Sequence, residues 1–307
     1  MSSNPGQVVP AAAALESEEA SRPIQPPVKS KGGAGDVVYQ ITSQALLLFW
    51  AVIVIYPFLW MIYSSFKTEP EISRTPFSLP AELQWDNFSR AWNAASIGDF
   101  VLNTLIVMSM SLTGTIIVSA MAAYVLSRFD FPGNRLLFLL FTAGLMFPMF
   151  LGLVPLYFLM NDLNLRDTYF GLALVYIADS LPFTIFFLIG FFKTLPGEVA
   201  EASIMDGASQ VETFFRIMLP MAKPGLIAMA IFNFLGQWNQ FLLPLVLMPS
   251  KPLISQGLNY LSIQQGYQSD YGALFAAMTI TMVPTLVIYV LFQRRLESGL
   301  TAGALKG

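Results

Sequence analysis

The chain has 307 residues, of which 55% are hydrophobic and only 11% are charged, whereas roughly a quarter of an ordinary soluble domain is charged. This composition indicates a membrane protein, and a net charge of −3 provides no basic footprint for a nucleic-acid partner. The absence of both Cys and His excludes disulfides, thiolate or imidazole metal ligands, and the Ser-His and Cys-His pairs of nucleophilic catalysis.

The first 36 residues are rich in Pro, Ala, Gly and acidic residues. A segment of this composition cannot bury a core, so we predict a disordered tail over residues 1–36. It also lacks the charged start and the apolar region that follows it in a secretory signal peptide. The first hydrophobic run is therefore expected to be retained, and residues 37–307 are expected to form a transmembrane domain.

Six apolar stretches are long enough to cross a bilayer core of about 30 Å, which takes roughly 20 residues of helix. They predict an all-α membrane protein with six transmembrane helices. Pro residues inside several stretches predict kinks, because neighbouring helices can satisfy the carbonyls that are freed. The stretches are approximately Ser43–Phe66, Phe100–Ser127, Leu136–Met160, Tyr169–Phe192, Pro224–Leu247 and Gly272–Phe292.

The distribution of Lys and Arg predicts the orientation of these spans. Six spans place both termini on one side, and most of the basic residues lie in the two terminal segments and in the loops after the second and fourth spans. Because basic residues are enriched on the cytoplasmic side, we predict that both termini are cytoplasmic, including a C-terminal tail over about residues 293–307. The loop after the fourth span is then cytoplasmic too.

This loop, over about residues 195–222, is polar although it separates two long apolar runs. Pro196 is placed to begin a helix, and Gly207 to end it. Ser209 and Glu212 have the spacing of a capping box, which predicts a second helix that ends at Pro220. These patterns alone fit equally well with an amphipathic loop that lies on the membrane surface.

The loop also carries a longer pattern, which is an EAA-like triplet, three residues, a Gly, nine residues and IxLP. This pattern resembles the EAA loop of the membrane subunits of bacterial ABC importers, except that Ser replaces the second Ala of the triplet. The neighbouring Asp206 and the closing sequence GLTAGALKG are similar to the MalG-type permeases of the carbohydrate-uptake subfamily. The resemblance covers about residues 40–307, and its loop positions are Glu201, Ala202, Ser203, Gly207, Ile217, Leu219 and Pro220.

The resemblance implies the six-helix fold of a type I ABC importer in the cell membrane. It implies a heterodimer with a homologous second permease, a dimer of ATP-binding subunits that binds ATP and Mg, and an extracytoplasmic solute-binding protein. This chain has no phosphate-binding GxxxxGK[ST] loop, which agrees with ATP binding on another chain. We therefore expect no cofactor, no metal and no covalent catalysis in this chain.

In the family, the EAA loop forms a coupling helix that docks in a cleft on the ATP-binding subunit. Carried onto this sequence, Glu201 is the expected anchor, Ala202 and Ser203 the close-contact face, and Gly207 the turn. A short element tied to two spans can convert closure of the nucleotide dimer into a tilt of those spans. The resemblance also implies that the C-terminal tail reaches the ATPase dimer.

Polar residues within two of the spans are candidates for a substrate pathway. Asn233, Gln237 and Gln240 are spaced to share one helical face, with Trp238 alongside. They suit a neutral, hydroxyl-rich ligand, but the same amides could instead join this helix to the partner subunit by interhelical hydrogen bonds. Asp179 is the only ionisable residue deep in a span, and it is either a ligand contact or a packed polar group.

Two other functions compete with the importer. A proton-coupled secondary transporter of a neutral solute needs titratable groups in the membrane, and Asp179 alone is thin support. An intramembrane enzyme needs a catalytic set, and the spans hold no paired carboxylates. Because no span interior carries Lys or Arg, we expect the cargo to be a neutral sugar or oligosaccharide.

Overall fold

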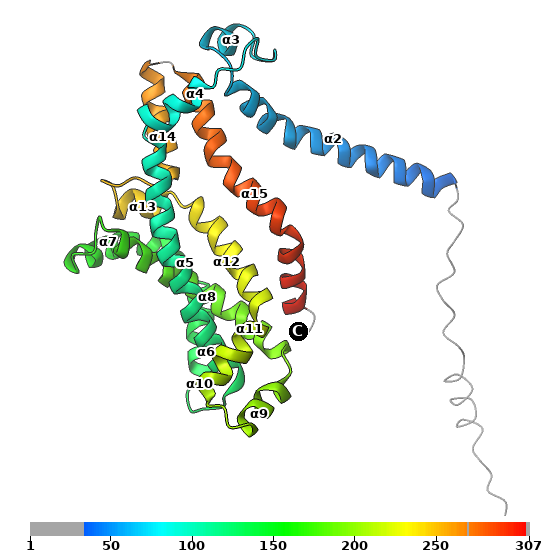
Figure 1. Cartoon of the computed structure of the whole chain (residues 1–307), viewed down its shortest axis with the longest axis vertical. Helices are drawn as coiled ribbons and strands as arrows, with labels where there is room; N and C mark the ends of the chain where they lie inside the picture. Colours follow the sequence, from blue (N-terminus) through cyan, green and yellow to red (C-terminus); the bar gives the residue numbers. More distant parts are fainter. Residues whose placement is uncertain (1–33, 269, 305–307) are drawn as a thin grey trace, which may run out of the picture. The chain divides into compact units, whose positions relative to one another are not determined.

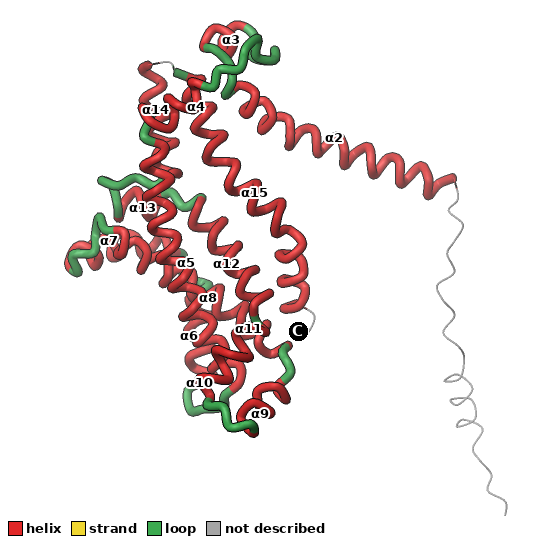
Figure 2. Tube along the Cα trace, in the orientation of Figure 1, coloured by secondary structure: helices red, strands yellow, loops and turns green. Residues whose placement is uncertain are grey.

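The computed structural model describes residues 34–268 and 270–304, and these residues form helices joined by loops, with no strand among them (Figure 2). This confirms the prediction of an all-α fold. Contacts within the chain divide it into two units, residues 1–57 and residues 58–307, and each is described by itself. The predicted tail of residues 1–36 falls mostly outside the described residues.

Four helices are long and apolar enough to cross a membrane, and up to six spans result if each of two sharply bent helix pairs counts as one. The first, α2 (Ala34–Ser64), is a continuous helix of 31 residues that contains Pro57. The others are α5 (Ile97–Arg128), α8 (Tyr169–Thr194) and α15 (Tyr271–Ala304). α15 continues beyond the predicted end of its span, so the predicted C-terminal tail begins as helix.

The third predicted span is not one straight helix. Its residues form α6 (Asn134–Gly144), a 3-10 turn (Met149–Gly152) and α7 (Leu153–Asp162), and the two halves are bent by 90°. The bend lies at residues 145–148, where Pro148 has an extended backbone. Proline removes a backbone donor and disfavours helix in the residue before it, which is why the apolar run breaks here.

The fifth predicted span also differs from the expectation. The helix α12 (Lys223–Trp238) ends within the apolar run, and the short helix α13 (Leu242–Leu247) follows after three residues. A further helix, α14 (Ile254–Gln268), was not predicted from the sequence. The second bent pair joins the segment Gln210–Met221 to Lys223–Trp238 at 71°.

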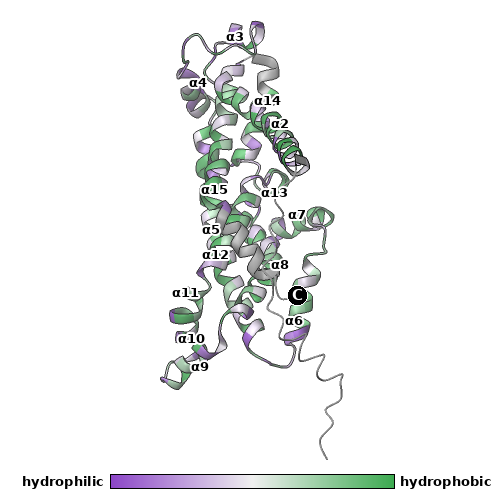
Figure 3. Cartoon of the chain, turned by 90° about the vertical axis from the view of Figure 1, so that its right-hand side faces the viewer, coloured by the Kyte–Doolittle hydropathy of each residue, from purple (hydrophilic) through white to green (hydrophobic). Residues whose placement is uncertain are grey.

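Within residues 58–307, α5 and α8 pack side by side and form the centre of the helix bundle, with α12 and α15 against them (Figure 1). Three buried apolar clusters fill the spaces between these helices. One joins α5 to α14 and α15, one joins α5 to α8 and α13, and one lies where α5 and α8 approach the polar loop. Hydrophobic residues dominate the long helices, whereas hydrophilic residues gather at α3, α4 and α9 (Figure 3).

The segment between α2 and α5 contains α3 (Glu69–Arg74), α4 (Asp86–Ser89) and a π-helix (Arg90–Ala94). Polar contacts fasten it to the start of α15. The guanidinium group of Arg90 donates to Asp270 at 3.0 Å and to Asn87 at 2.7 Å. The amide of Asn87 in turn donates to the backbone carbonyls of Ser65 and Lys67. This segment and the first turn of α15 are therefore held together as one body.

Candidate functional site

The polar loop after α8 folds as two short helices joined by a turn. α9 (Gly197–Met205) begins after Pro196, and Gly207 follows it with φ +88°, a left-handed conformation that glycine adopts without strain. α10 (Gln210–Thr213) begins at Ser209, and its capping box is complete. The Ser209 hydroxyl accepts from the Glu212 amide at 3.2 Å, and the Ser209 amide donates to the Glu212 carboxylate at 3.1 Å.

Pro220 does not end the second helix as predicted. After α10 the chain continues through a π-helix (Phe214–Met218), α11 (Leu219–Met221) and α12, with Pro220 in the first turn of α11. Proline has no backbone amide to donate within a helix, and the wider π-helical turn lies directly before α11. The loop is thus mostly helical up to the fifth span, with a bend of 71° at Ala222.

The side chains of the EAA-like triplet lie on different sides of α9. Glu201 and Ala202 are exposed, whereas Ser203 is 6% exposed and faces the interior of the loop. Its hydroxyl lies 3.0 Å from the hydroxyl of Thr213, which is fully buried. This hydrogen bond joins α9 to α10 across the Gly207 turn. The position where the family pattern has Ala therefore braces the loop internally.

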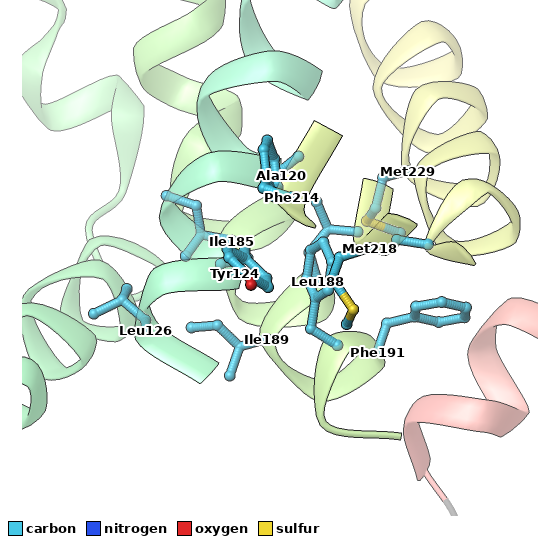
Figure 4. Close-up of a cluster of buried hydrophobic side chains, with 13 residues drawn as sticks. Ala120, Tyr124, Leu126, Ile185, Leu188, Ile189, Phe191, Phe214, Met218 and Met229 are labelled. Carbon is cyan, nitrogen blue, oxygen red and sulfur yellow. The ribbon is translucent and has the colours of Figure 1, made fainter. Parts of the chain in front are cut away.

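The second half of the loop is anchored in a buried cluster at the ends of α5 and α8 (Figure 4). Phe214 and Met218 are buried there, and the ring of Phe214 lies 5.0 Å from that of Tyr124. Ile217 and Leu219 pack on the edge of the cluster. Because aromatic and apolar side chains interlock here, a displacement of the loop must move the ends of the long helices with it.

The first half of the loop is tied to α5 by Arg128. Its guanidinium group donates to the carbonyls of Phe192 and Leu195, at 2.9 and 2.6 Å. Glu201, Asp206 and Gly207 remain exposed at the tip. The loop therefore presents an exposed tip on a base that is fixed to α5, α8 and α12.

A cavity of about 230 Å³ lies between α8 and α12. Asp179, Asn233, Gln237 and Gln240 line it, so the structure brings together four of the five predicted pathway residues. Gln240 lies just beyond the end of α12 at Trp238. The remaining lining residues are Tyr176, Ser180 and Phe183 from α8, and Phe232 and Gly236 from α12.

Two amides of the cavity also join helices. The Asn233 side chain donates to the Thr184 hydroxyl at 3.0 Å, and the Gln237 side chain donates to Ser180 at 3.3 Å. Gln237 also accepts from the Ser111 hydroxyl of α5 at 2.5 Å. These amides therefore join helices of this chain to one another, whereas the alternative left open by the sequence was bonding to the partner permease. They hold α5, α8 and α12 together around the cavity.

Other lining groups are not used in this way. The Tyr176 side chain is 2% exposed, and its hydroxyl has no hydrogen-bond partner among the described residues. Asp179 is exposed, and no donor of the described chain bonds to its carboxylate. The rings of Phe183 and Phe232 contact each other, with centroids 6.0 Å apart. Sequence reasoning missed this pair, although Phe183 follows Asp179 by one helical turn.

Trp238 does not join the cavity. It is 3% exposed, its indole donates to the Thr281 carbonyl at 3.1 Å, and its ring stacks on Phe234. Successive residues of a helix point about 100° apart, so Trp238 faces α15 while Gln237 faces α8. The structure therefore assigns Trp238 to helix packing.

A model of the binding-protein-dependent transport system inner membrane component family matches residues 115–302 of this chain. The chain belongs to this family. It is a permease of an ABC importer and a multi-pass membrane protein, and ATP is hydrolysed on a separate subunit. Such a permease works with a second permease, ATP-binding subunits and a solute-binding protein.

The permease is similar to several curated proteins. It is 48% identical over 275 residues, or 89% of this chain and 91% of the relative, to the diacetylchitobiose uptake system permease protein NgcG of Streptomyces coelicolor. It is 31% identical over 278 residues, or 90% of this chain and 100% of the relative, to the trehalose transport system permease protein SugB of Mycobacterium tuberculosis. The MalG-type resemblance is thereby confirmed.

The fold also matches a solved structure. A chain from the crystal structure of a bacterial ABC transporter involved in the import of the acidic polysaccharide alginate superimposes with a TM-score of 0.77 at 20% sequence identity. The match covers 87% of the permease and 99% of that chain. It confirms the ABC importer fold.

Proposed function

We propose that this permease forms half of the pathway for a neutral sugar or oligosaccharide, and that an N-acetylated disaccharide is the favoured cargo. The observation that carries the proposal is the cavity between α8 and α12, which is lined by amides, one carboxylate, hydroxyls and aromatic rings and by no Lys or Arg. A phosphorylated or acidic cargo needs cationic partners. A neutral sugar needs the hydrogen-bonding groups that are present.

The place of Asp179 supports the same reading. The residue lies in the middle of α8, and its side chain is exposed in this chain. A carboxylate facing lipid at this depth is costly, so such groups face a cavity or a protein partner. We infer that this face of α8 lines the pathway and meets the homologous second permease. The names of two relatives, at 48% and 33% identity, specify diacetylchitobiose uptake.

Uptake by the complete importer tests the cargo. The complex of both permeases, the ATPase dimer and the solute-binding protein is placed in proteoliposomes, and uptake of labelled N,N′-diacetylchitobiose is followed with and without internal ATP. We expect ATP-dependent uptake that unlabelled diacetylchitobiose abolishes and an acidic sugar does not. If the complex hydrolyses ATP but accumulates no neutral sugar, the proposed cargo class is wrong.

We also propose that the loop over about residues 195–222 docks on the ATP-binding subunit from the cytoplasmic side, with both termini on that side. The support is its exposed tip on a base that is fixed to α5, α8 and α12. On this proposal Glu201 is the anchor, and ATP and Mg are bound entirely by the partner. Glu201→Ala should then abolish uptake while membrane insertion stays normal.

The absence of Cys from the sequence makes the docking testable. Ile204 is 41% exposed on α9, so Ile204→Cys places one thiol on the proposed contact face. We expect a nucleotide-dependent cross-link to the ATP-binding subunit. Val211→Cys, on the neighbouring helix, serves as the accessibility control. Labelling of both thiols by a soluble maleimide without any cross-link would refute docking through α9.

A further inference from the structure

The buried hydroxyl of Tyr176 stands out in the cavity between α8 and α12. The side chain is 2% exposed, it lines the cavity, and its oxygen has no partner among the described residues. Buried polar groups in native proteins nearly always have a hydrogen-bond partner, because an unpartnered one loses its water without compensation. A group that enters the cavity would supply the missing partner.

Asp179 lies one helical turn further along α8 and lines the same cavity. Residues three apart lie on the same side of a helix. The phenol of Tyr176 offers a donor and the carboxylate of Asp179 offers acceptors, and no hydrogen bond within the described residues occupies either. No cation lines the cavity, so this pair suits a neutral ligand that has an acceptor and a donor close together.

The cavity also has an apolar wall beside these two residues. Phe183 follows Asp179 by one turn, and its ring contacts that of Phe232 from α12 at 6.0 Å between centroids, with the planes at 61°. Both rings line the cavity, and Phe183 is 41% exposed. The wall is therefore open to a ligand, and it favours a methyl group or another apolar part of it.

We propose that Tyr176 and Asp179 recognise the acetamido group of an N-acetylated sugar. The phenolic O–H donates to the acetamido carbonyl, the acetamido N–H donates to the Asp179 carboxylate, and the methyl group packs against the Phe183 and Phe232 rings. The inference rests on the proposed function, and it names the chemical group that distinguishes this cargo. A hydroxyl group in the same place supplies no methyl group for the aromatic wall.

The test is equilibrium binding of two disaccharides to the detergent-purified complex of both permeases and the ATPase dimer, without the solute-binding protein. N,N′-diacetylchitobiose carries two acetamido groups, and cellobiose has hydroxyls in their place. Tyr176→Phe removes only the hydroxyl. We expect it to weaken binding of diacetylchitobiose about tenfold, the scale of one hydrogen bond lost in a dry site, and to change cellobiose binding by less than about twofold.

The matched control is Tyr169→Phe on the same helix, whose hydroxyl bonds to Asn103 away from the cavity; it should leave both affinities unchanged. An equal loss for both sugars with Tyr176→Phe would show that the hydroxyl recognises a group common to both, and would overturn the acetamido assignment. Unchanged affinities, or no measurable binding to the wild-type complex, would overturn the site itself.

A structural role predicts a different result for the same variant. An unpartnered hydroxyl with no ligand destabilises the fold, so its removal would leave binding unchanged and raise the thermal stability of the complex. If Tyr176→Phe does not assemble, Asp179→Asn replaces it, because it keeps the side-chain size and weakens the acceptor; the same selective loss is expected. Wild-type uptake distinguishes the two proposals, since failure of the proposed function abolishes uptake and failure of this inference does not.

Discussion

The hydrogen bond between Ser203 and Thr213 provides a quantitative prediction for the loop after α8. Both side chains are at least 94% buried, and their hydroxyls lie 3.0 Å apart. Ser203→Ala or Thr213→Val removes one hydroxyl and leaves the other buried without a partner, which costs about 1–3 kcal/mol. Removing both leaves no unpartnered group. The double variant should therefore lose less free energy of folding than the sum of the losses of the two single variants.

Hydrogen exchange of the α9 amides measures this cost, because these amides exchange when the loop opens locally. In the assembled complex, each single variant should accelerate exchange about 5- to 150-fold, and the double variant should remain within about tenfold of wild type. Gln210→Ala, an exposed change in the same loop, is the control. Equal protection in wild type and Ser203→Ala, or additive acceleration in the double variant, would refute the brace.

Three further predictions concern the loop and the cavity. Gly207 has φ +88°, so Gly207→Ala should destabilise the loop by about 1–2 kcal/mol and reduce uptake. Gly190→Ala, where the added carbon meets no neighbouring atom, should leave uptake unchanged, and equal uptake by the two variants would contradict this prediction. The hydrogen bonds from Ser209 hold the pKa of Glu212 below its usual value, with Arg216 contributing. The capping box should therefore stabilise α10 above about pH 4, and this stabilisation should be lost as the pH falls through the lowered pKa. Amide hydrogen exchange in α10 should show this loss, and Glu212→Gln should remove the pH dependence. Gln237→Leu removes the donor to the Ser180 hydroxyl and leaves the Ser111 hydroxyl with only its longer bond to the Met108 carbonyl, at 3.3 Å. It should therefore destabilise the complex by about 1–3 kcal/mol in thermal unfolding while the ATPase still co-purifies; loss of the ATPase would place Gln237 in assembly instead.

Local patterns were enough for much of this fold. Apolar runs of sufficient length predicted the four continuous spans, since a helix is the structure that satisfies its own backbone in lipid. The Ser209 and Glu212 spacing predicted a capping box that the structure contains, and Gly207 was placed correctly as the turn. The spacing of the EAA-like pattern indicated the family. Each of these features depends on residues within a few turns of one another.

The tertiary structure decided what depends on contacts between distant segments. The 90° bend in the third span is one such feature, and a run of apolar residues cannot show which proline breaks its helix. The direction of Trp238, toward α15 and away from the cavity, is set by a partner 43 residues later in the chain. The bond from Ser203 to Thr213 and the unpartnered hydroxyl of Tyr176 appear only once side chains are packed.

The sequence by itself thus determined the class of protein, the apolar runs of its spans and the short helices of the polar loop, because hydrophobic length and capping act locally. Only the tertiary structure decided which polar groups face each other and which are left without a partner. Hydrogen bonds between helices depend on the rotation and register of each helix, and packing against several neighbours sets both. The proposed acetamido site is a product of that packing.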